Sequence, residues 1–455
     1  FSPGIFDLLA NSLLMSIPWV LLYRTARVLP KVAYLSLPAF WLTFEWAHYN
    51  WDLNWPWLTL GNGFAEFPGL VQWYEYVGTP GGSLWILGVN IVIYLAVYAP
   101  PTGSKSTIWR SPVTLATLVL LPLVFSLIRF YTYSPPAGED ITVGAIQPNF
   151  EPHFEKFSSD YRTQLDTFVP LTRAAVTAAG HLDYVLYPET SFSRIEEDKV
   201  LESPTVRRLT EALGDLNLDY LVTGYDGYYI FKPGDERTKA TRRIPRSNGQ
   251  ILELEAINGT VQIDLKANEV QTYRKGVFVP GAESFPFRDV LWFAKPLVDQ
   301  LGGSTEGRAT QTRRTALIGD KARIAPVICY ESVFGDYFTD YITEGAQAIF
   351  VMTNDGWWDH TAGYRQHLYF SSLRAIETRR AVVRSANVGA CAFIDQRGHI
   401  VSQTPYDEMG FLNGSLKLND RITLYVRLGD FLSRIAGLLS IMLLASSFTQ
   451  GRMKK

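Results

Sequence analysis

The sequence has few cysteines, few histidines and few charged residues for its length. Its 455 residues include 2 cysteines and 6 histidines, and charged residues make up 19% of the chain. Cys329 and Cys391 are too few for a disulfide framework, although they allow one bond. The formal net charge of −2 lacks the basic surplus that is typical of nucleic-acid-binding proteins. We therefore expect neither a disulfide-rich fold nor a nucleic-acid partner.

Metal-site and targeting signals are also missing. His153, His360 and His367 lack the spacing of zinc ligands, and no serine is paired with a histidine as in hydrolase triads. The start of the chain has no basic region followed by a cleavage site, so it does not look like a signal peptide. Because the first residue is Phe1, we expect the chain to begin partway through a longer protein. We expect no metal and no cofactor.

Long apolar runs occupy both ends of the sequence. A bilayer core needs about 20 mostly apolar residues per helix, and five runs approach this length: residues 5–23, 32–46, 82–98, 113–128 and 431–448. Any single run has a buried core helix as its alternative, but the set of five makes that alternative weak. We predict a transmembrane helical domain over residues 1–135, and a C-terminal transmembrane helix with a basic tail over residues 422–455.

Lysine and arginine in the short connections predict an orientation for these spans. They gather between the first two runs, between the third and fourth, and at the chain end: Arg24, Arg27, Lys31, Lys105, Arg110, Arg452, Lys454 and Lys455. Five alternating spans place all three groups on one side, which we predict to be cytoplasmic. Residues 136–421 then lie on the external face. An odd number of further spans would precede Phe1 if the true N-terminus is cytoplasmic.

The external connection at residues 47–81 is dense in tryptophan and tyrosine. These side chains favour the headgroup level of a bilayer, because each combines an apolar ring with a polar edge. The connection is therefore either a simple aromatic belt or a re-entrant floor that faces lipid, and both interpretations stay open.

The middle of the chain alternates short apolar segments with helical stretches. Apolar runs of this kind suit strands buried on both faces, and they occur at residues 141–146, 184–187, 220–223, 261–265, 324–328 and 348–352. Residues 161–180 and 366–380 have helical periodicity, and residues 381–383 and 390–394 predict a strand pair before a turn at 395–398. The alternation predicts an α/β fold. A layered α-β-β-α sandwich fits at least as well as a barrel, and periodicity alone does not decide.

Three short segments stand out because each ends a strand with an ionisable side chain: Glu189, Lys275 and Cys329. A carboxylate, an ammonium and a thiol supply the base, the oxyanion stabiliser and the nucleophile of cysteine-based acyl transfer. Each is weak alone, since a cysteine after an apolar strand is most often a small buried residue. In this order they together predict an acyl-transfer site.

The order Pro-Glu, Lys and Cys-Tyr-Glu resembles that of the nitrilase superfamily, whose Glu-Lys-Cys triad lies on an α-β-β-α sandwich. Joined to the apolar runs, the chain resembles the bacterial apolipoprotein N-acyltransferases. Further motifs carry the resemblance: Gln147-Pro148-Asn149, Asn354-Asp355-Gly356-Trp357-Trp358, Arg374-Ala375-Ile376-Glu377, Arg384-Ser385-Ala386-Asn387 and Tyr425-Val426-Arg427-Leu428-Gly429-Asp430. The resemblance implies a nitrilase-like α-β-β-α sandwich inserted between transmembrane α-helices, with a catalytic domain over residues 136–421.

The resemblance also implies a role for each member of the triad. Glu189 would be the general base, Lys275 the oxyanion stabiliser and Cys329 the nucleophile. Glu283 matches a further glutamate of the family, which orients or tunes the lysine, and Glu331 matches another. For these two glutamates, a structural salt bridge to arginine or lysine is the alternative.

Three other residues belong to these motifs or to the strands. Asn354 and Trp357 lie in one of the matching motifs, and we expect them to support the site or to bind substrate. Cys391 lies in a strand-like run, so we expect it in the core. Apolar residues around 285–305 either form the substrate entrance or pack in the core: Phe285, Phe287, Leu291, Trp292 and Phe293.

The implied reaction has two steps and two lipid-linked partners. Cys329 would take an acyl chain from a membrane phospholipid, and the N-terminal α-amine of a diacylated lipoprotein would accept it. The resemblance places such an enzyme in the bacterial inner membrane, multi-pass, with its catalytic domain on the periplasmic face, and we expect a monomer. A membrane-anchored amidase or nitrilase and a catalytically inactive nitrilase-like scaffold are the alternatives. A transporter is disfavoured, because no ionisable pair recurs within the spans.

Overall fold

The computed structural model describes residues 3–98, 111–151, 161–247, 249–296 and 307–453. The chain divides into two compact units. The helical unit comprises Phe1–Thr132 and Arg427–Lys455, and the α/β unit comprises Tyr133–Val426. The short helix α10 (Leu424–Leu428) spans the boundary between them in the sequence.

Five helices of the helical unit coincide with the apolar runs of the sequence. They are α1 (Pro3–Val28), α2 (Ala33–Tyr49), α3 (Tyr74–Val97), α4 (Pro112–Thr132) and α11 (Phe431–Met453). Within the described residues, α3, α4 and the Phe431–Gly451 part of α11 are long and apolar enough to cross a membrane, with mean hydropathies of 1.7, 2.2 and 1.7. Helix α2 has 17 residues, at the lower limit for a span. Four of the basic residues that orient the spans lie outside the described residues: Lys105, Arg110, Lys454 and Lys455.

The aromatic connection after α2 folds into three short 3₁₀ turns: η2 (Pro56–Leu58), η3 (Leu60–Phe64) and η4 (Pro68–Leu70). The buried carboxylate of Glu45 on α2 holds the second turn, since its Oε1 accepts a hydrogen bond from Leu60 N at 2.9 Å. Gly61 N donates to Ser83 Oγ on α3 at 3.0 Å. The connection is thus tied to the helices of its own unit. Its role as an aromatic belt or as a floor stays a prediction.

The first sheet of the α/β unit has eight strands in the order β14-β1-β2-β4-β6-β5, with β3 also paired to β4 and β7 to β6. Strands β1, β2 and β4 are parallel to one another, whereas β14 and β6 run antiparallel to their neighbours. The strands are β1 (Asp140–Gln147), β2 (Leu182–Leu186), β3 (Phe192–Glu196), β4 (Leu218–Ile230), β5 (Arg242–Pro245), β6 (Ile251–Asp264), β7 (Glu269–Arg274) and β14 (Gly410–Lys417).

The second sheet has six strands in the order β13-β12-β11-β10-β9-β8. Its three central strands are parallel and are buried along almost their whole length, which explains their continuous apolar runs in the sequence. The strands are β8 (Leu317–Ile318), β9 (Arg323–Ile328), β10 (Ala348–Thr353), β11 (Val382–Ala386), β12 (Ala392–Ile394) and β13 (Ile400–Gln403).

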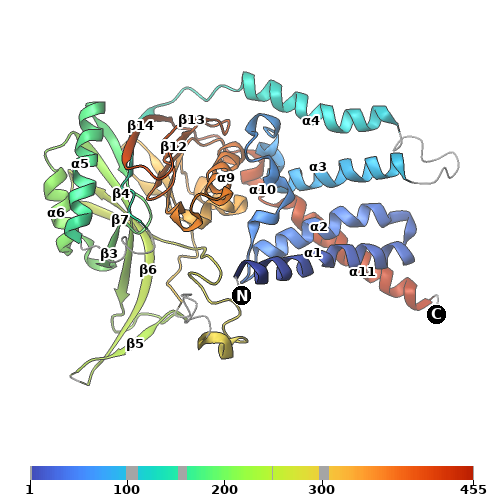
Figure 1. Ribbon diagram of the computed structural model, residues 1–455, viewed down its shortest axis with the longest axis horizontal. Coiled ribbons are helices and arrows are strands. Elements are labelled where there is room, and N and C mark those ends of the chain that lie inside the picture. The colour runs from blue at the N-terminus through green and yellow to red at the C-terminus, as the bar shows by residue number, and fades with distance from the viewer. Residues whose placement is uncertain (1–2, 99–110, 152–160, 248, 297–306, 454–455) are drawn as a thin grey trace. The chain divides into compact units, whose positions relative to one another are not determined.

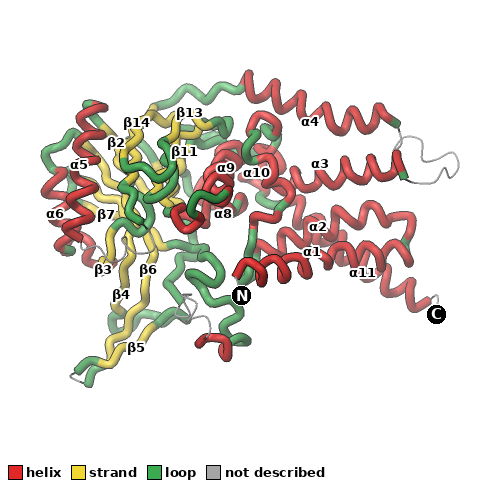
Figure 2. The backbone as a smooth tube through the Cα atoms, in the orientation of Figure 1, coloured by secondary structure: helices red, strands yellow, loops and turns green. Residues whose placement is uncertain are grey.

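Helices cover the outer face of each sheet. Figures 1 and 2 show α5 (Tyr161–Ala179) and α6 (Pro204–Leu213) outside the first sheet, and α8 (Gly335–Thr343) and α9 (Ala362–Thr378) beyond the second. Helix α5 buries Leu165, Phe168 and Val176 on one face, the spacing of an amphipathic helix. Phe168 stacks on Tyr187 just past β2, with ring centroids 4.4 Å apart.

The two sheets pack face to face through side chains of their inner surfaces. Tyr184 on β2 meets Phe350 on β10 edge to face, with ring centroids 5.4 Å apart. Thr260 Oγ1 on β6 donates to Met352 Sδ on β10 at 3.5 Å, and Ser385 Oγ on β11 donates to the carbonyl of Ile146 on β1 at 2.8 Å. The layers are therefore helix, sheet, sheet, helix, and the predicted α/β sandwich is confirmed.

The apolar segment around residue 290 is exposed. Trp292 and Phe293 are 71% and 65% exposed, so these two side chains are not part of the core. Phe285, Phe287 and Leu291 are only partly buried. Residues 297–305, which were part of the same expectation, lie outside the described residues.

Candidate active site

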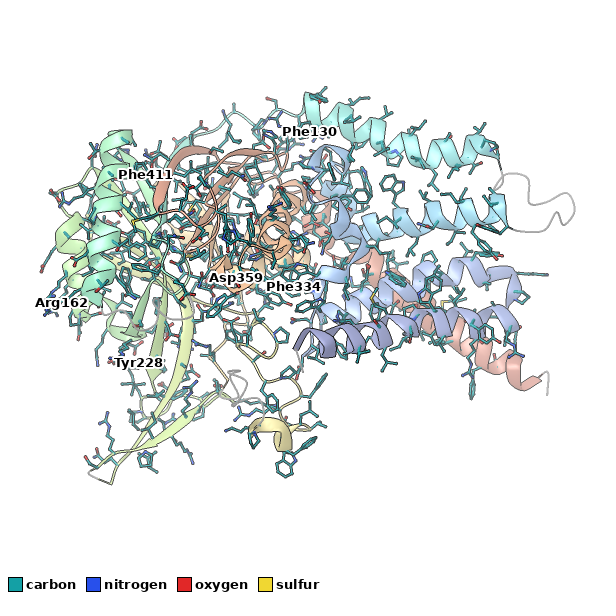
Figure 3. All side chains as sticks on the ribbon, viewed as in Figure 1. Phe130, Arg162, Tyr228, Phe334, Asp359 and Phe411 are labelled. Carbon is teal, nitrogen blue, oxygen red and sulfur yellow. The ribbon has the colours of Figure 1, made fainter. Side chains whose placement is uncertain are left out.

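Three predicted site residues converge from the ends of three strands. Glu189 lies in the turn after β2, and Lys275 follows β7 directly, both in the first sheet. Cys329 follows β9 of the second sheet and begins the 3₁₀ turn η7 (Cys329–Val333). In Figure 3, the labelled Phe334 and Asp359 directly follow η7 and η8 (Asp355–Trp358), the turns after β9 and β10. The convergence depends on the packing of the two sheets, because each supplies part of the group.

The ammonium of Lys275 is buried between two carboxylates. Its Nζ lies 2.9 Å from Glu189 Oε1 and 2.9 and 2.8 Å from the two oxygens of Glu283. Lys275 is 1% exposed and Glu189 6% exposed. Burial alone would lower the pKa of Lys275, but the negative charges of Glu189 and Glu283 outweigh it and hold that pKa above its ordinary value. Lys275 therefore stays charged at neutral pH.

Asn258 joins the two carboxylates from the middle of β6. Its Nδ2 donates to Glu189 Oε1 at 2.9 Å and to Glu283 Oε1 at 3.1 Å. Its main-chain carbonyl accepts a hydrogen bond from Lys275 N at 2.9 Å. The sequence prediction missed this residue. Asn258 precedes Gly259, and Asn-Gly usually indicates a hairpin turn, whereas here it lies inside a long strand.

The turn that carries Glu189 rests on the backbone of Gly224 in β4. Gly224 N donates to Pro188 O at 3.2 Å, and Ser191 N donates to Gly224 O at 2.9 Å. Thr190 has a φ of 47°, a left-handed conformation that is strained for a β-branched residue. A Cβ on Gly224 would lie 2.7 Å from Glu189 Cα and from Thr190 N. Only glycine lets the two backbones approach this closely.

Cys329 is the first residue of a strained turn. Its φ is 49°, a left-handed conformation that costs about 1–3 kcal/mol for a non-glycine residue. The thiol is buried, and it lies near Glu189, Lys275 and the hydroxyl of Thr353. Burial and the charge of Glu189 raise the pKa of the thiol well above its ordinary value, while Lys275 lowers it. The thiol is therefore protonated at neutral pH, and its activation requires a nearby base.

Glu331 ties the lysine turn to the cysteine turn. Its carboxylate accepts hydrogen bonds from Gly276 N at 2.6 Å and from Ile328 N at 2.8 Å. The hydroxyls of Tyr337 and Tyr273 donate to it at 2.6 and 3.1 Å. Burial raises the pKa of Glu331 above its ordinary value, although these hydrogen bonds act in the opposite direction. Glu331 thus binds backbone and tyrosine hydroxyl groups, whereas Glu283 forms a salt bridge with Lys275.

Asn354 and Trp357 lie in the turn that follows β10. Asn354 follows β10, is 1% exposed and accepts a hydrogen bond from Asn387 Nδ2 at 3.2 Å. Trp357 in η8 is 50% exposed. Substrate binding by Asn354 and Trp357 stays a prediction.

The second cysteine is part of the core. Cys391 is 0% exposed, and its sulfur accepts a hydrogen bond from Ala386 N at 3.4 Å. Burial raises the pKa of its thiol to about 12. Both cysteines are free.

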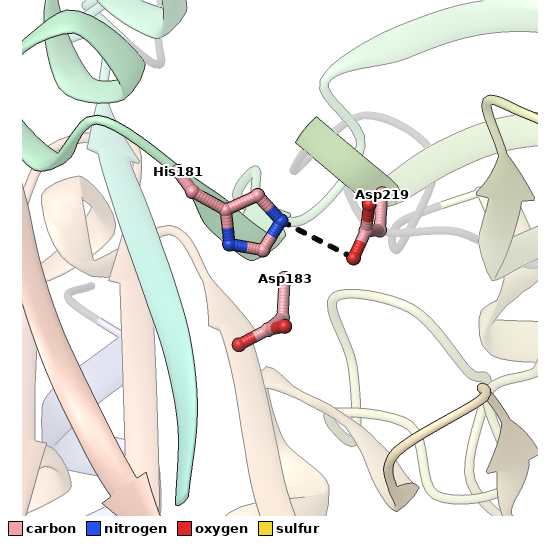
Figure 4. Close-up of side chains that lie close together, drawn as sticks. All are labelled: His181, Asp183 and Asp219. Carbon is pink, nitrogen blue, oxygen red and sulfur yellow. Dashed lines mark ion pairs between the residues drawn. The ribbon is translucent and has the colours of Figure 1, made fainter. Parts of the chain in front are cut away.

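A further group of ligand-type side chains lies at the opposite ends of β2 and β4, where these strands begin. Figure 4 shows His181, Asp183 and Asp219 close together, with an ion pair of 3.3 Å between His181 and Asp219. Both carboxylates already have lysine partners: Lys321 Nζ lies 2.5 Å from Asp183, and Lys266 Nζ lies 2.5 Å from Asp219. Their charges are therefore balanced without a cation.

Comparison with known proteins identifies the family of this fold and site. The family model for carbon-nitrogen hydrolases matches residues 142–424. The chain belongs to the carbon-nitrogen hydrolase family. A second family model, for the apolipoprotein N-acyltransferase N-terminal domain, matches residues 3–92. The resemblance predicted from the motifs is thus confirmed.

Individual relatives match the chain over most of its length. An apolipoprotein N-acyltransferase of Chlorobaculum tepidum is 29% identical over 97% of this chain and 83% of its own. One of Geobacter metallireducens is 25% identical over 87% of this chain and 70% of its own. A solved structure of a CN-hydrolase superfamily protein from Xanthomonas campestris aligns with a TM-score of 0.41 and 18% identity, over 61% of this chain and 91% of its own.

Replacing Glu189 by glutamine is expected to slow acyl transfer and, at the same time, to make the Cys329 thiol easier to ionise. Loss of the carboxylate that we predict to be the base should lower acyl transfer by about 10²–10⁴-fold. Loss of its negative charge should also lower the pKa of Cys329, because Glu189 raises that pKa. Alkylation of Cys329 by iodoacetamide should therefore begin to accelerate at a lower pH than in the wild type. Glu269→Gln, at an exposed position on β7, is the control. A pH profile of alkylation that does not move in Glu189→Gln would contradict this prediction.

Replacing Gly224 by alanine is expected to displace the turn that holds Glu189. The new Cβ would meet backbone atoms at 2.7 Å, and such overpacking costs about 1–3 kcal/mol. We expect a lower melting temperature and slower acyl transfer. Gly410→Ala is the matched control, since a Cβ there meets nothing within 4 Å. Equal stability and equal rates in the two variants would show that this close approach is unimportant.

Proposed function

We propose that this chain is an apolipoprotein N-acyltransferase. It transfers an acyl chain from a membrane phospholipid to the N-terminal α-amine of a diacylglyceryl-cysteine lipoprotein. The observation that carries the proposal is the buried Lys275, paired with Glu189 and Glu283 beside the Cys329 thiol. Relatives with this name match most of the chain, and helices of membrane length suit a lipid substrate.

In the first step, Cys329 becomes acylated. Its sulfur attacks the ester carbonyl of the phospholipid while Glu189 accepts the thiol proton. Negative charge develops on the carbonyl oxygen, and the ammonium of Lys275 stabilises it. The bond between the carbonyl carbon and the glycerol oxygen then breaks, and Glu189 passes the proton to that oxygen. The products are an acyl-thioester on Cys329 and a lysophospholipid.

In the second step, the lipoprotein amine takes the acyl chain. The neutral amine attacks the thioester carbonyl, and Glu189 accepts a proton from the attacking nitrogen. The carbon–sulfur bond breaks, and Glu189 returns the proton to the sulfur of Cys329. An amide has formed, and both Glu189 and Cys329 are restored. While Glu189 is protonated, Glu283 continues to pair with Lys275.

The amphiphilic substrates explain the combination of the two units. Donor and acceptor are both anchored in a bilayer, so a membrane-bound enzyme meets them without extracting them. By the positive-inside rule, the basic residues of the short connections support an external position for the α/β unit. We propose a multi-pass protein of the bacterial inner membrane, active as a monomer, with Glu189, Lys275 and Cys329 on the periplasmic side.

The test uses the full chain in vesicles of phosphatidylethanolamine and phosphatidylglycerol with a synthetic diacylglyceryl-cysteine lipopeptide. Mass spectrometry should find one added acyl chain on the lipopeptide and an equal amount of lysophospholipid. Cys329→Ala should reduce this transfer by about 10³-fold or more, since a nucleophile is hard to replace. Cys391→Ala, in the core, should retain it.

Other outcomes would favour the alternative functions. Full transfer by Cys329→Ala would show that another group is the nucleophile. Ammonia release from small amides, without acylation of the lipopeptide, would indicate an amidase-type hydrolase. Wild-type protein that is inactive in both assays would support a nitrilase-like scaffold.

A further inference from the structure

The main-chain carbonyl of Cys329 is held by one side chain from its own turn, η7, and one from helix α9. Ser332 Oγ donates to Cys329 O at 2.7 Å, and His367 Nε2 lies 3.1 Å from the same oxygen. Ser332 Oγ and His367 Nε2 are themselves 2.9 Å apart. Both residues are 0% exposed. The carbonyl oxygen can only accept, so the bond from His367 requires a hydrogen on Nε2.

The ring of His367 is in turn fixed on its other side. Its Nδ1 lies 2.8 Å from Asp355 Oδ1 and 2.9 Å from Arg384 Nη2. Arg384 also donates to Asp355 Oδ2 at 2.5 Å. Since Nδ1 faces both an acceptor and a donor, the ring keeps its orientation in either protonation state. This leaves Nε2 directed at the carbonyl of Cys329.

The same network reaches the thiol from a second direction. Thr353 Oγ1 donates to Asp355 Oδ1 at 2.9 Å, and the side chain of Thr353 also interacts with the thiol of Cys329. The arrangement of Ser332, His367 and Asp355 has the order of a serine-hydrolase triad. The hydroxyl of Ser332, however, is buried and donates its hydrogen bond to the main-chain carbonyl of Cys329, so it is not directed at a substrate.

We propose that His367, together with Ser332, is a positioning residue for the nucleophile: by holding the main-chain carbonyl of Cys329, the two side chains keep the left-handed turn in which the thiol faces Glu189 and Lys275. The inference rests on the proposed function, in which Cys329 is the nucleophile. The φ of 49° at Cys329 is strained, and such a conformation persists only where surrounding contacts hold it. The buried chain from Arg384 through Asp355 and His367 supplies those contacts.

The test compares His367→Ala with His367→Gln in single-turnover formation of the acyl-thioester from phospholipid vesicles. Glutamine retains an N–H donor near the position of Nε2, whereas alanine does not. The rate constant should fall by about a hundredfold in His367→Ala, as expected for a misplaced reacting group, and glutamine should restore most of it. Partial unfolding would instead lower the amplitude and leave the rate constant of the folded fraction unchanged. The KM for phospholipid should change little.

Two further variants complete the design. His360→Ala, at a side chain that is 76% exposed, should match the wild type in rate and amplitude. Ser332→Ala removes only one hydroxyl and should slow thioester formation several-fold, so it tests the proposal even if His367→Ala does not fold. A wild-type rate constant in His367→Ala or in Ser332→Ala would overturn the proposal, as would a glutamine variant as slow as the alanine variant.

Alkylation of Cys329 by iodoacetamide separates this inference from the proposed function, because it needs no natural substrate. His367→Ala should alkylate more slowly than the wild type at the same pH, and His367→Gln should recover. If the wild type acylates no lipopeptide but this pattern is found, the proposed function fails and the positioning role stands. If lipopeptide is acylated but all variants alkylate at one rate, the positioning role is wrong.

Discussion

The ammonium of Lys275, buried between the carboxylates of Glu189 and Glu283, is the interaction on which the rest of the site depends. A buried charge needs close partners with good geometry, and removal of one partner leaves the others uncompensated. Here three nitrogen–oxygen distances of 2.8–2.9 Å meet that need. Asn258 adds hydrogen bonds to both carboxylates, so the group is fixed from a strand rather than from a mobile loop. The lysine follows β7 and the first glutamate follows β2, which means that the register of the first sheet sets the position of both.

This charge arrangement also explains how a protonated thiol could act as the nucleophile in the reaction that we propose. Two carboxylates and one ammonium leave a net charge of −1 beside Cys329, which raises the pKa of the thiol together with burial. Ionisation towards solvent would add a second negative charge to a buried site. Transfer of the proton from the thiol to Glu189 keeps the net charge at −1, so burial does not oppose it in the same way. Glu283 then remains as the partner of Lys275. A second glutamate beside the lysine is therefore a requirement of the proton transfer that we propose.

The sequence predicted the central strands and the three strand-end residues, because both depend on local patterns. Buried parallel strands appear as short apolar runs, and Glu189, Lys275 and Cys329 each come at or soon after the end of a strand. The residues that the prediction missed act through contacts distant in sequence. Asn258 resembled part of a turn, although it lies inside β6. Nothing in the sequence around Gly224 indicates that the backbone of Glu189 packs closely against it. His367 was considered only as a metal ligand, since its partners Asp355 and Cys329 are brought to it by the packing of α9 on the second sheet.

The site is divided between the two sheets, and this division gives Glu331 its importance. Glu189, Asn258 and Lys275 belong to the first sheet, whereas Cys329 belongs to the second. Any change in the spacing of the sheets would separate Glu189 from the thiol. Glu331 accepts from Gly276 N, just after β7, and from Ile328 N, at the end of β9, so one carboxylate fixes the two turns relative to each other. A neutral side chain of similar size would offer donors as well as acceptors and could not accept from both amides and both tyrosines equally. The carboxylate at this position is thus explained by geometry between the sheets, without any direct part in the chemistry.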